Sequence, residues 1–243
     1  MTVSLLCLPC AGASAGMYLR WRRWLPGWVR LVPVELPGRG TRTSDAFIDN
    51  FDALVAHLCE VHQQESAGSY ALFGHSMGGL IAHAMAMYWR DNGRRMPEAL
   101  FVSASPSPKH RDASYFADKE TDSALIADLR KQGGTPREVF EDPQMLRSVL
   151  DTLRADYRVC SGYRARHDRP LAVPLHVFAG RQDDIESERI LAWESETSAQ
   201  FSVRWFEGGH FFIRQHEAAV VSEVAHQLLG AAPEMAHEPA VGA

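Results

Sequence analysis

The sequence reads Tyr70-Ala71-Leu72-Phe73-Gly74-His75-Ser76-Met77-Gly78 within its first third, and this stretch indicates the fold. Tyr70–Phe73 is an apolar run of strand length, and the residues after Gly78, with Ile81 and Met85 on one side, have the period of a buried helix. The pattern Gly-x-Ser-x-Gly lies between them, where a strand meets a helix in a tight turn. Glycines on either side let the neighbouring chain pass close by. We therefore predict a strained turn that lifts the hydroxyl of Ser76 above the edge of a sheet.

Apolar runs of strand length recur on both sides of this stretch and alternate with segments of helical period. The further predicted strands are Val3–Leu8, Val29–Val34, Ala99–Ser103, Leu175–Ala179 and Phe201–Phe206. Predicted helices include one that begins near Asn50 and one that carries Val220, Val224 and Leu228 on one face. Alternation of this kind builds a largely parallel sheet with helices on both faces, so the expected class is α/β.

The alternation is interrupted once, between residues 106 and 169, where the pattern is helical throughout. Asp142-Pro143 marks the start of a helix, and an apolar stripe follows it from Met145 to Tyr157. We therefore expect residues 1–105 and 170–230 to form the core and residues 106–169 to form a helical lid inserted between two strands. The stripe either lines a chamber under this lid or is buried against the sheet. Residues 231–243 have no period and are expected to form a disordered tail.

The composition indicates a cytoplasmic globular protein without affinity for polyanions. The 243 residues include 25 Lys and Arg against 30 Asp and Glu, and a net charge of −5 does not attract nucleic acids or anionic membranes. The N-terminus lacks the basic region and the cleavage site of a secretory signal. Residues 66–89 have no Asp, Glu, Lys or Arg and are long enough to span a bilayer, but glycines and histidines lie at their centre. A buried strand followed by a buried helix explains this stretch better.

The four cysteines are Cys7, Cys10, Cys59 and Cys160. Cys7 and Cys10 form a C-x-x-C pair, but Cys7 lies inside an apolar run, and no second pair at matching spacing completes a zinc site. We therefore expect reduced thiols and no bound metal, as in a cytosolic protein.

A serine hydroxyl is a weak nucleophile until a base removes its proton, so Ser76 requires a histidine and an orienting carboxylate. His210 lies in Gly208-Gly209-His210-Phe211-Phe212, directly after the last predicted strand and thus at the carboxyl edge of the sheet, where Ser76 also lies. A carboxylate is available after the fifth predicted strand, in Gly180-Arg181-Gln182-Asp183-Asp184. The order Ser76, Asp183, His210 is the order of the catalytic triad in the α/β-hydrolase fold.

The carboxylate has three candidates. Asp183 and Asp184 both follow the strand directly, and the Gly-x-x-Asp spacing from Gly180 favours Asp183. Asp156 is a more distant candidate, which a salt bridge on a helix surface explains better. Because the two neighbouring aspartates differ only by one position, substitution of each in turn has to decide between them.

A tetrahedral intermediate on Ser76 needs two backbone N–H donors for its oxyanion. One is expected from Met77, which begins the predicted helix, where N–H groups lack partners within the helix. The other is expected from Ala11 in the loop Pro9–Ser14, which follows the first predicted strand. Taken alone, that loop is more typical of a plain glycine turn.

With these segments in this order, the sequence resembles the stand-alone (type II) thioesterases that accompany nonribosomal peptide and polyketide synthetases and have the α/β-hydrolase fold. The resemblance covers residues 8–229 and rests on five segments, which are Leu8–Ala13, Glu35–Gly40, Phe73–Gly79, Leu153–Tyr157 and Gly208–Phe212. The chain departs from the family at Cys10, where an aromatic residue or histidine is usual, and at Ala13, where glycine is usual. Asp184 stands where a proline often follows the acid.

The resemblance implies hydrolysis of acyl or aminoacyl thioesters on the phosphopantetheine arm of acyl- or peptidyl-carrier proteins. The reaction would pass through an acyl-enzyme on Ser76 without a cofactor, in a monomer whose lid covers the entering arm. Two other functions are compatible with these residues, namely a carboxylesterase or lipase that acts on free esters and an inactive hydrolase fold that serves as a binding module. The complete set of Ser76, His210 and Asp183 argues against the binding module.

Overall fold

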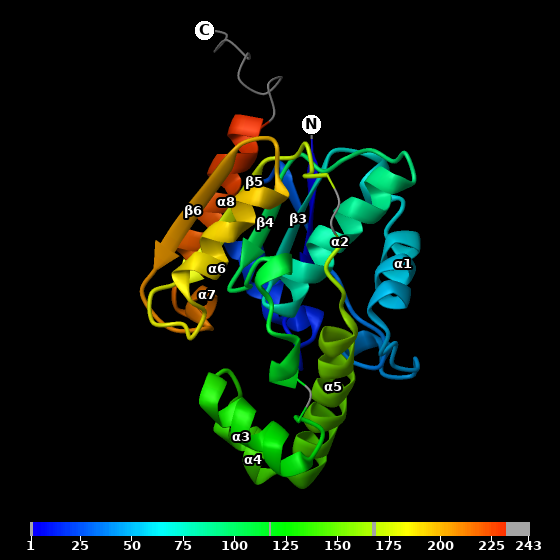
Figure 1. Cartoon of the computed structure of the whole chain (residues 1–243), viewed down its shortest axis with the longest axis vertical. Coiled ribbons are helices and arrows are strands. Elements are labelled where there is room, and N and C mark those ends of the chain that lie inside the picture. Colours follow the sequence, from blue (N-terminus) through cyan, green and yellow to red (C-terminus); the bar gives the residue numbers. More distant parts are fainter. Residues whose placement is uncertain (1, 117, 167–168, 232–243) are drawn as a thin grey trace, which may run out of the picture.

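The computed structural model describes residues 2–116, 118–166 and 169–231, and one sheet lies at its centre (Figure 1). The sheet has six strands in the order β2-β1-β3-β4-β5-β6, and every neighbouring pair is parallel. The strands are β1 (Val3–Leu8), β2 (Val29–Pro33), β3 (Tyr70–His75), β4 (Leu100–Ser103), β5 (Leu175–Gly180) and β6 (Phe201–Phe206). The predicted strands and the α/β class are confirmed. Apart from Ala231, the predicted tail lies outside the described residues.

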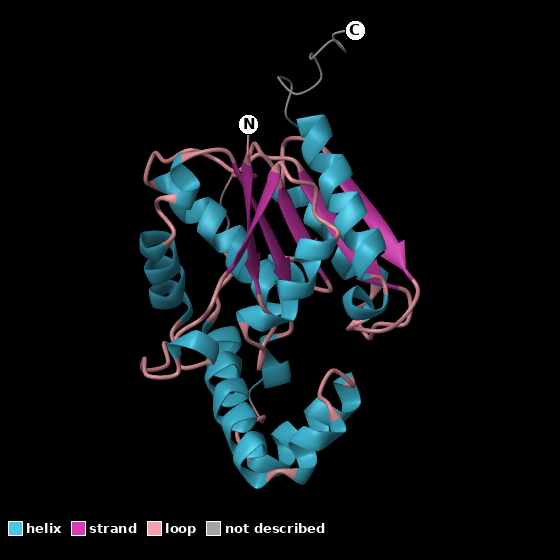
Figure 2. Cartoon of the chain, turned by 180° about the vertical axis from the view of Figure 1, so that it is seen from behind, coloured by secondary structure: helices cyan, strands magenta, loops and turns pink. Residues whose placement is uncertain are grey.

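Helices cover both faces of the sheet (Figures 1 and 2). One layer contains α1 (Phe51–Val61), α2 (Met77–Asp91) and α6 (Ser187–Leu191), and the other contains the 3-10 helix Ala15–Arg23 and α8 (Glu217–Ala231). Residues of β1 alternate between the layers, since Leu6 and Leu8 contact the first whereas Leu5 and Cys7 contact the second. A strand that is buried on both faces must be apolar at nearly every position, which explains the continuous apolar runs in the sequence.

Aromatic side chains fix the strand ends that lead into the candidate site. The ring of Phe73 on β3 lies 4.8 Å from that of Trp21 and 5.8 Å from that of Tyr18, in edge-on contacts. The Tyr18 hydroxyl donates a hydrogen bond of 2.7 Å to the carbonyl of Leu8, the last residue of β1. These buried rings hold the carboxyl ends of β1 and β3 side by side, and both ends carry loops of the site.

Between β4 and β5 the chain forms a helical segment beyond the carboxyl ends of the strands, and its longer helices are seen at the bottom of Figure 1. Its described helices are the 3-10 helices Pro108–His110 and Ala113–Phe116, followed by α3 (Asp122–Gln132), α4 (Arg137–Glu141) and α5 (Pro143–Gly162). Apart from the exposed Met145, the apolar stripe of α5 packs against α3 in a small core that includes Leu125, Leu129, Leu150, Leu153 and Tyr157. The expectation that this stripe is buried against the sheet is therefore wrong.

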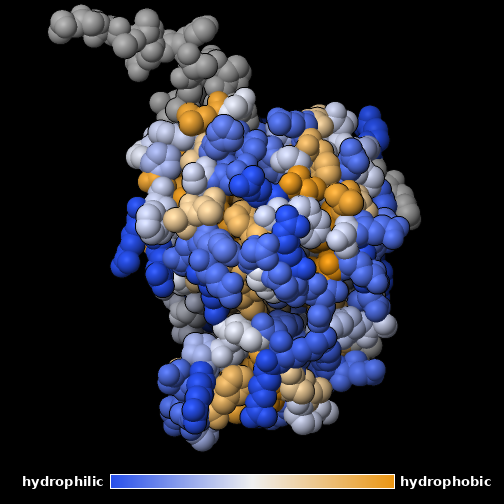
Figure 3. Space-filling view, turned by 90° about the vertical axis from the view of Figure 1, so that its left-hand side faces the viewer, coloured by the Kyte–Doolittle hydropathy of each residue, from blue (hydrophilic) through white to orange (hydrophobic). Residues whose placement is uncertain are grey.

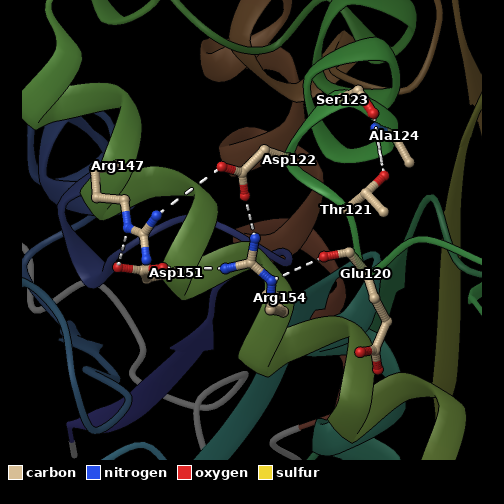
Figure 4. Close-up of polar contacts among 8 residues, drawn as sticks. All are labelled: Glu120, Thr121, Asp122, Ser123, Ala124, Arg147, Asp151 and Arg154. Atoms are coloured by element: carbon tan, nitrogen blue, oxygen red, sulfur yellow. Dashed lines mark hydrogen bonds and ion pairs between the residues drawn. The ribbon is translucent and has the colours of Figure 1, made fainter.

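An ion-pair network fastens the start of α3 to α5 (Figure 4). Arg154 lies 3.0 Å from Asp151 and also contacts Asp122, and its Nε donates to the carbonyl of Glu120 at 3.0 Å. Arg147 lies 3.1 Å from Asp151 and 3.9 Å from Asp122, so each of these two aspartates lies between two arginines. Exposed ion pairs of this kind contribute modestly to stability, but as a network they fix the angle between the two helices.

Residues 66–89 form the buried strand and buried helix that the sequence predicts. Hydrophilic residues cover most of the face in Figure 3, and apolar residues show between them in small groups. Within the described ranges, none of the helices is both long and apolar enough to cross a bilayer. The uncharged stretch contains β3 and α2, whose side chains are largely buried in the fold.

Two of the buried histidines lie on strands of the sheet, in the neutral form. His75 at the end of β3 has its Nδ1 2.9 Å from the hydroxyl of Ser103, and burial, together with the nearby charges, lowers its pKa well below the usual value. His176 on β5 has its Nδ1 2.7 Å from the hydroxyl of Ser202, and burial lowers its pKa to about 4. Both histidines take up a proton far more readily in the unfolded chain than in the folded one.

Acid is therefore expected to destabilise the fold below the pKa of an unfolded histidine. The unfolded chain binds protons below about pH 6.5 while the buried rings stay neutral, so each ring removes about 1.4 kcal/mol of the free energy of unfolding at pH 5.5. Urea unfolding at pH 7.5, 6.5 and 5.5 measures this loss. His83 on α2, whose pKa burial lowers to about 3, adds to the loss in the same way. His176→Asn retains a partner for Ser202 and should lose about 1.4 kcal/mol less than the parent chain between pH 7.5 and pH 5.5, whereas the exposed control His226→Asn should behave as the parent chain. An unchanged pH dependence in His176→Asn would contradict the prediction.

Candidate active site

Ser76 occupies the strained turn between β3 and α2 that the sequence predicts. Its φ of 55° and ψ of −116° lie in a region that residues with a Cβ atom rarely adopt. Two glycines make the turn possible, because a Cβ atom on Gly74 would lie 2.0 Å from the carbonyl oxygen of Gly78, and one on Gly78 would lie 2.2 Å from that of Leu8. The backbone at this turn thus leaves no room for other residues at the flanking positions.

His210 and Asp183 come together from the loops after β6 and β5. The Nδ1 of His210 lies 2.9 Å from Oδ2 of Asp183, and the side chain of Asp183 is only 7% exposed. The two loops are joined by their backbones, since the N–H of Gln182 donates to the carbonyl of Gly208 at 3.0 Å. With Nδ1 directed to the carboxylate, Nε2 is the ring nitrogen that remains for a reacting group.

Asp184 points in another direction from Asp183. Its carboxylate lies 2.7 Å from Nζ of Lys131 on α3, and its side chain is 77% exposed. The hydrogen bond and charge of Lys131 lower the pKa of Asp184. Asp183, which the Gly-x-x-Asp spacing favours, is therefore the aspartate that contacts the imidazole of His210. Asp184 instead connects the site to the helical segment through Lys131.

Asp156 is not on a helix surface as the sequence suggested. Its side chain is 1% exposed, and its two oxygens each lie 2.6 Å from a guanidinium nitrogen of Arg39, which is 7% exposed. Oδ2 also accepts the N–H of Gly12 at 2.8 Å. Arg39 and Gly12 lie more than a hundred residues from Asp156 in the sequence. The pattern of charged residues along the helix therefore did not predict these contacts.

The five predicted site residues line one cavity of about 340 Å³. Ser76 and Met77 reach it from the turn before α2, Asp183 and His210 from the loops after β5 and β6, and Ala11 from the loop after β1. The helical segment forms the other side through Arg111, Tyr115, Phe116, Lys131, Gln132 and Tyr157, among others. Apart from Tyr157 in the apolar stripe, the sequence predicted none of these residues individually, nor core residues of the lining such as Leu80, Ile185 and Arg189.

The candidate oxyanion donors belong to two different backbone elements. Met77 is the first residue of α2, so its N–H is not engaged within the helix. Ala11 lies in a tight loop in which the N–H of Ala13 donates to the carbonyl of Cys10 at 3.1 Å. Cys10 also lines the cavity, and burial raises the pKa of its thiol to about 12, so this sulfur stays protonated and does not compete as a nucleophile.

The described residues contain no group of three or more His, Cys, Asp or Glu side chains that would hold a metal ion. The cysteines of the C-x-x-C pair are both buried free thiols. The predicted site residues bring a hydroxyl, an imidazole, a carboxylate and two backbone amides to the cavity.

Comparison with known proteins gives a family for this arrangement. The chain matches the thioesterase domain family over residues 3–228. It is 31% identical over 225 residues to gramicidin S biosynthesis protein GrsT of Aneurinibacillus migulanus, with 92% of this chain and 88% of that protein covered. It is similar to the crystal structure of ClbQ from the colibactin NRPS/PKS pathway, with a TM-score of 0.90, 32% identity and coverage of 98% of this chain and 100% of that chain.

A second solved structure leads to the same family. The RedJ thioesterase from the prodiginine pathway in Streptomyces coelicolor has a TM-score of 0.85 and 31% identity, and the match covers 93% of this chain and 90% of that chain. These matches confirm the resemblance that the sequence motifs indicated, and they extend over the strained turn, the helical segment and both loops of the site. The chain therefore belongs to the thioesterase family, and its structural neighbours include the type II thioesterase BorB from the borrelidin biosynthetic cluster.

Proposed function

We propose that the chain hydrolyses acyl and aminoacyl thioesters on the phosphopantetheine arm of carrier proteins, with Ser76 as nucleophile, His210 as base and Asp183 as the acid that orients it. The observation that carries the proposal is the contact of 2.9 Å between His210 and Asp183 in the cavity that Ser76 enters from its strained turn. Thioester hydrolysis is the activity of the family, and the pathways of GrsT and ClbQ support a carrier-bound substrate.

The reaction begins when Nε2 of His210 takes the proton of Ser76 and the serine oxygen bonds to the thioester carbonyl carbon. The negative charge on the carbonyl oxygen is stabilised by the N–H groups of Met77 and Ala11, while Asp183 stabilises the imidazolium. The carbon–sulfur bond then breaks and the pantetheine thiol leaves with the proton from His210. Because a thiol has a pKa near ~8.5, its thiolate needs less protonation than an alkoxide would.

The second half of the reaction regenerates the enzyme. His210 takes a proton from water, and the resulting hydroxide bonds to the carbonyl carbon of the acyl-enzyme. The bond to Ser76 breaks, the serine oxygen recovers its proton from His210, and the carboxylic acid is released. The steps use side chains, backbone amides and water, so the proposal needs no cofactor, and we assign the reaction to a monomer in the cytoplasm.

The helical segment, residues 106–169, is proposed as a lid over the core formed by residues 1–105 and 170–230. Its aromatic residues Tyr115, Phe116 and Tyr157 line the cavity opposite Ser76. An apolar wall excludes water and suits an acyl chain, whereas Arg111 and Lys131 give the same cavity polar positions. The acyl group and the arm would thus lie between the lid and the strand ends.

A panel of carrier proteins tests this function. Carriers loaded with short acyl, longer acyl and aminoacyl groups are incubated with the enzyme, and intact mass spectrometry follows the loss of each group. We expect release from carriers at rates well above those for the corresponding oxygen esters of a small alcohol. If the oxygen esters are cleaved efficiently while the carriers keep their acyl groups, the enzyme is a carboxylesterase instead.

A further inference from the structure

A buried ion pair holds the loop that contributes Ala11 to the cavity. We call residues 10–13 the oxyanion loop. The carboxylate of Asp156 accepts the N–H of Gly12 at 2.8 Å, and Nη1 of Arg39 donates to the carbonyl of Ala13 at 3.3 Å. Asp156 and Arg39 bind each other through two contacts of 2.6 Å. The pair therefore contacts two consecutive residues of the loop, one through its N–H group and one through its carbonyl.

The geometry of this contact determines the direction of the neighbouring amide. Ala11 directly precedes Gly12, whose φ of +75° favours glycine, so the loop makes its turn at the residue that Asp156 binds. If the carboxylate releases the N–H of Gly12, the turn of the loop loses the contact that holds it, and the preceding peptide, which carries the N–H of Ala11, is free to shift. An oxyanion donor must lie within a few tenths of an ångström of its place to be effective.

Stability alone does not account for the pair. Removing two charges from water has a cost that their attraction often fails to exceed, and apolar residues of similar volume frequently replace such pairs without loss of stability. Asp156 and Arg39 are 1% and 7% exposed, so this cost applies to both. Apolar side chains would not make the two polar contacts that this pair makes with the backbone of Gly12 and Ala13 in the oxyanion loop.

We propose that Asp156, together with Arg39, is a positioning residue for the oxyanion hole and sets the orientation of the Ala11 N–H. The inference rests on the proposed function, since it assumes that Ala11 is an oxyanion donor. Because Asp156 lies on α5, the same pair also couples the helical segment to the oxyanion loop, so this end of the lid stays fixed when a substrate binds.

Asp156→Asn is the first test, because it removes the charge and retains the shape. Loss of one oxyanion donor lowers kcat by about 10²–10³-fold, and misorientation of one should lower it by about 10–100-fold with little change in KM. The inhibition constant of butane-1-boronic acid, which forms a tetrahedral adduct with a serine, should rise by a similar factor. A role in folding alone would not change the affinity of the folded enzyme for this analogue.

A matched control lies two residues away on the same helix. Arg154→Gln breaks the ion pairs with Asp122 and Asp151 at the far side of α5 and leaves the oxyanion loop untouched. We expect a lower unfolding midpoint in this variant with unchanged kcat, KM and boronate affinity. If Asp156→Asn loses stability in the same way but keeps kcat and boronate affinity, the positioning role is wrong.

A double variant keeps the test decisive if Asp156→Asn fails to fold. In Arg39→Met with Asp156→Leu, the buried charges are replaced by apolar side chains of similar size, which should restore stability but not the contacts to Gly12 and Ala13. We expect kcat and boronate affinity to stay low. Full activity in this double variant would overturn the inference, whereas an inactive parent enzyme on acyl-carriers would overturn the proposed function instead.

Discussion

Ser76→Ala is expected to lower kcat/KM for a carrier-bound thioester by about 10⁵-fold, because members of a catalytic triad act as a unit. In the proposed mechanism this hydroxyl forms the acyl-enzyme, and the thiol of Cys10, which lines the same cavity, stays protonated. His210→Ala should have an effect of similar size. Steady-state assays with one acyl-carrier, followed by intact mass spectrometry, measure both losses.

The fold should not change in Ser76→Ala. Alanine has the same backbone preferences as serine at a φ of 55°, so the strain of the turn is retained and the unfolding midpoint should stay within a few degrees of the parent. A variant with this midpoint and near-parental hydrolysis would show that the nucleophile lies elsewhere. If the midpoint of Ser76→Ala is greatly lowered, Ser76→Gly replaces it, because glycine lacks the same hydroxyl and tolerates a φ of 55°.

Asp183→Asn is expected to reduce kcat/KM by about 10³–10⁴-fold, whereas Asp184→Asn should remain within about twofold of the parent enzyme. Both substitutions remove one negative charge at adjacent positions, so they form a matched pair. Asp183 is nearly buried and contacts the imidazole, and an asparagine there favours the wrong tautomer of His210. Asp184 is mostly exposed and contacts Lys131 at the surface.

Kinetics of the two variants side by side decide the assignment. The loss in Asp183→Asn should fall on kcat, because the carboxylate orients the base and does not bind the substrate. A larger loss from Asp184→Asn than from Asp183→Asn would reverse the assignment of the acid.

Much of the site was predictable because its determinants are local in the sequence. Gly74 and Gly78 flank Ser76 at fixed spacing, and the apolar run before them and the helical period after them specify a strand, a turn and a helix. Parallel strands bring their carboxyl ends to one edge, so loops after β3, β5 and β6 had to meet. The spacing from Gly180 favoured Asp183 without deciding the choice, and Asp183 is the aspartate that contacts the imidazole.

The rest depends on contacts between segments that are distant in the sequence. Arg39 and Asp156 each lie in a segment that the family resemblance singled out, but their pairing requires the helical segment to be placed on the core. In the sequence, Asp156 has the appearance of an ordinary charge on an amphipathic helix. Likewise, the stripe on α5 has the period of a buried face, and this period does not specify whether the sheet or α3 covers it.

The most direct test of the account is covalent labelling with a fluorophosphonate, which reacts with a serine only when a base activates it. Peptide mapping by mass spectrometry should find one added phosphonyl group, on Ser76, in the parent enzyme. Ser76→Ala should remain unlabelled, and His210→Ala should react far more slowly. Labelling at another residue, or an unchanged labelling rate in His210→Ala, would contradict the claim that the imidazole activates this hydroxyl.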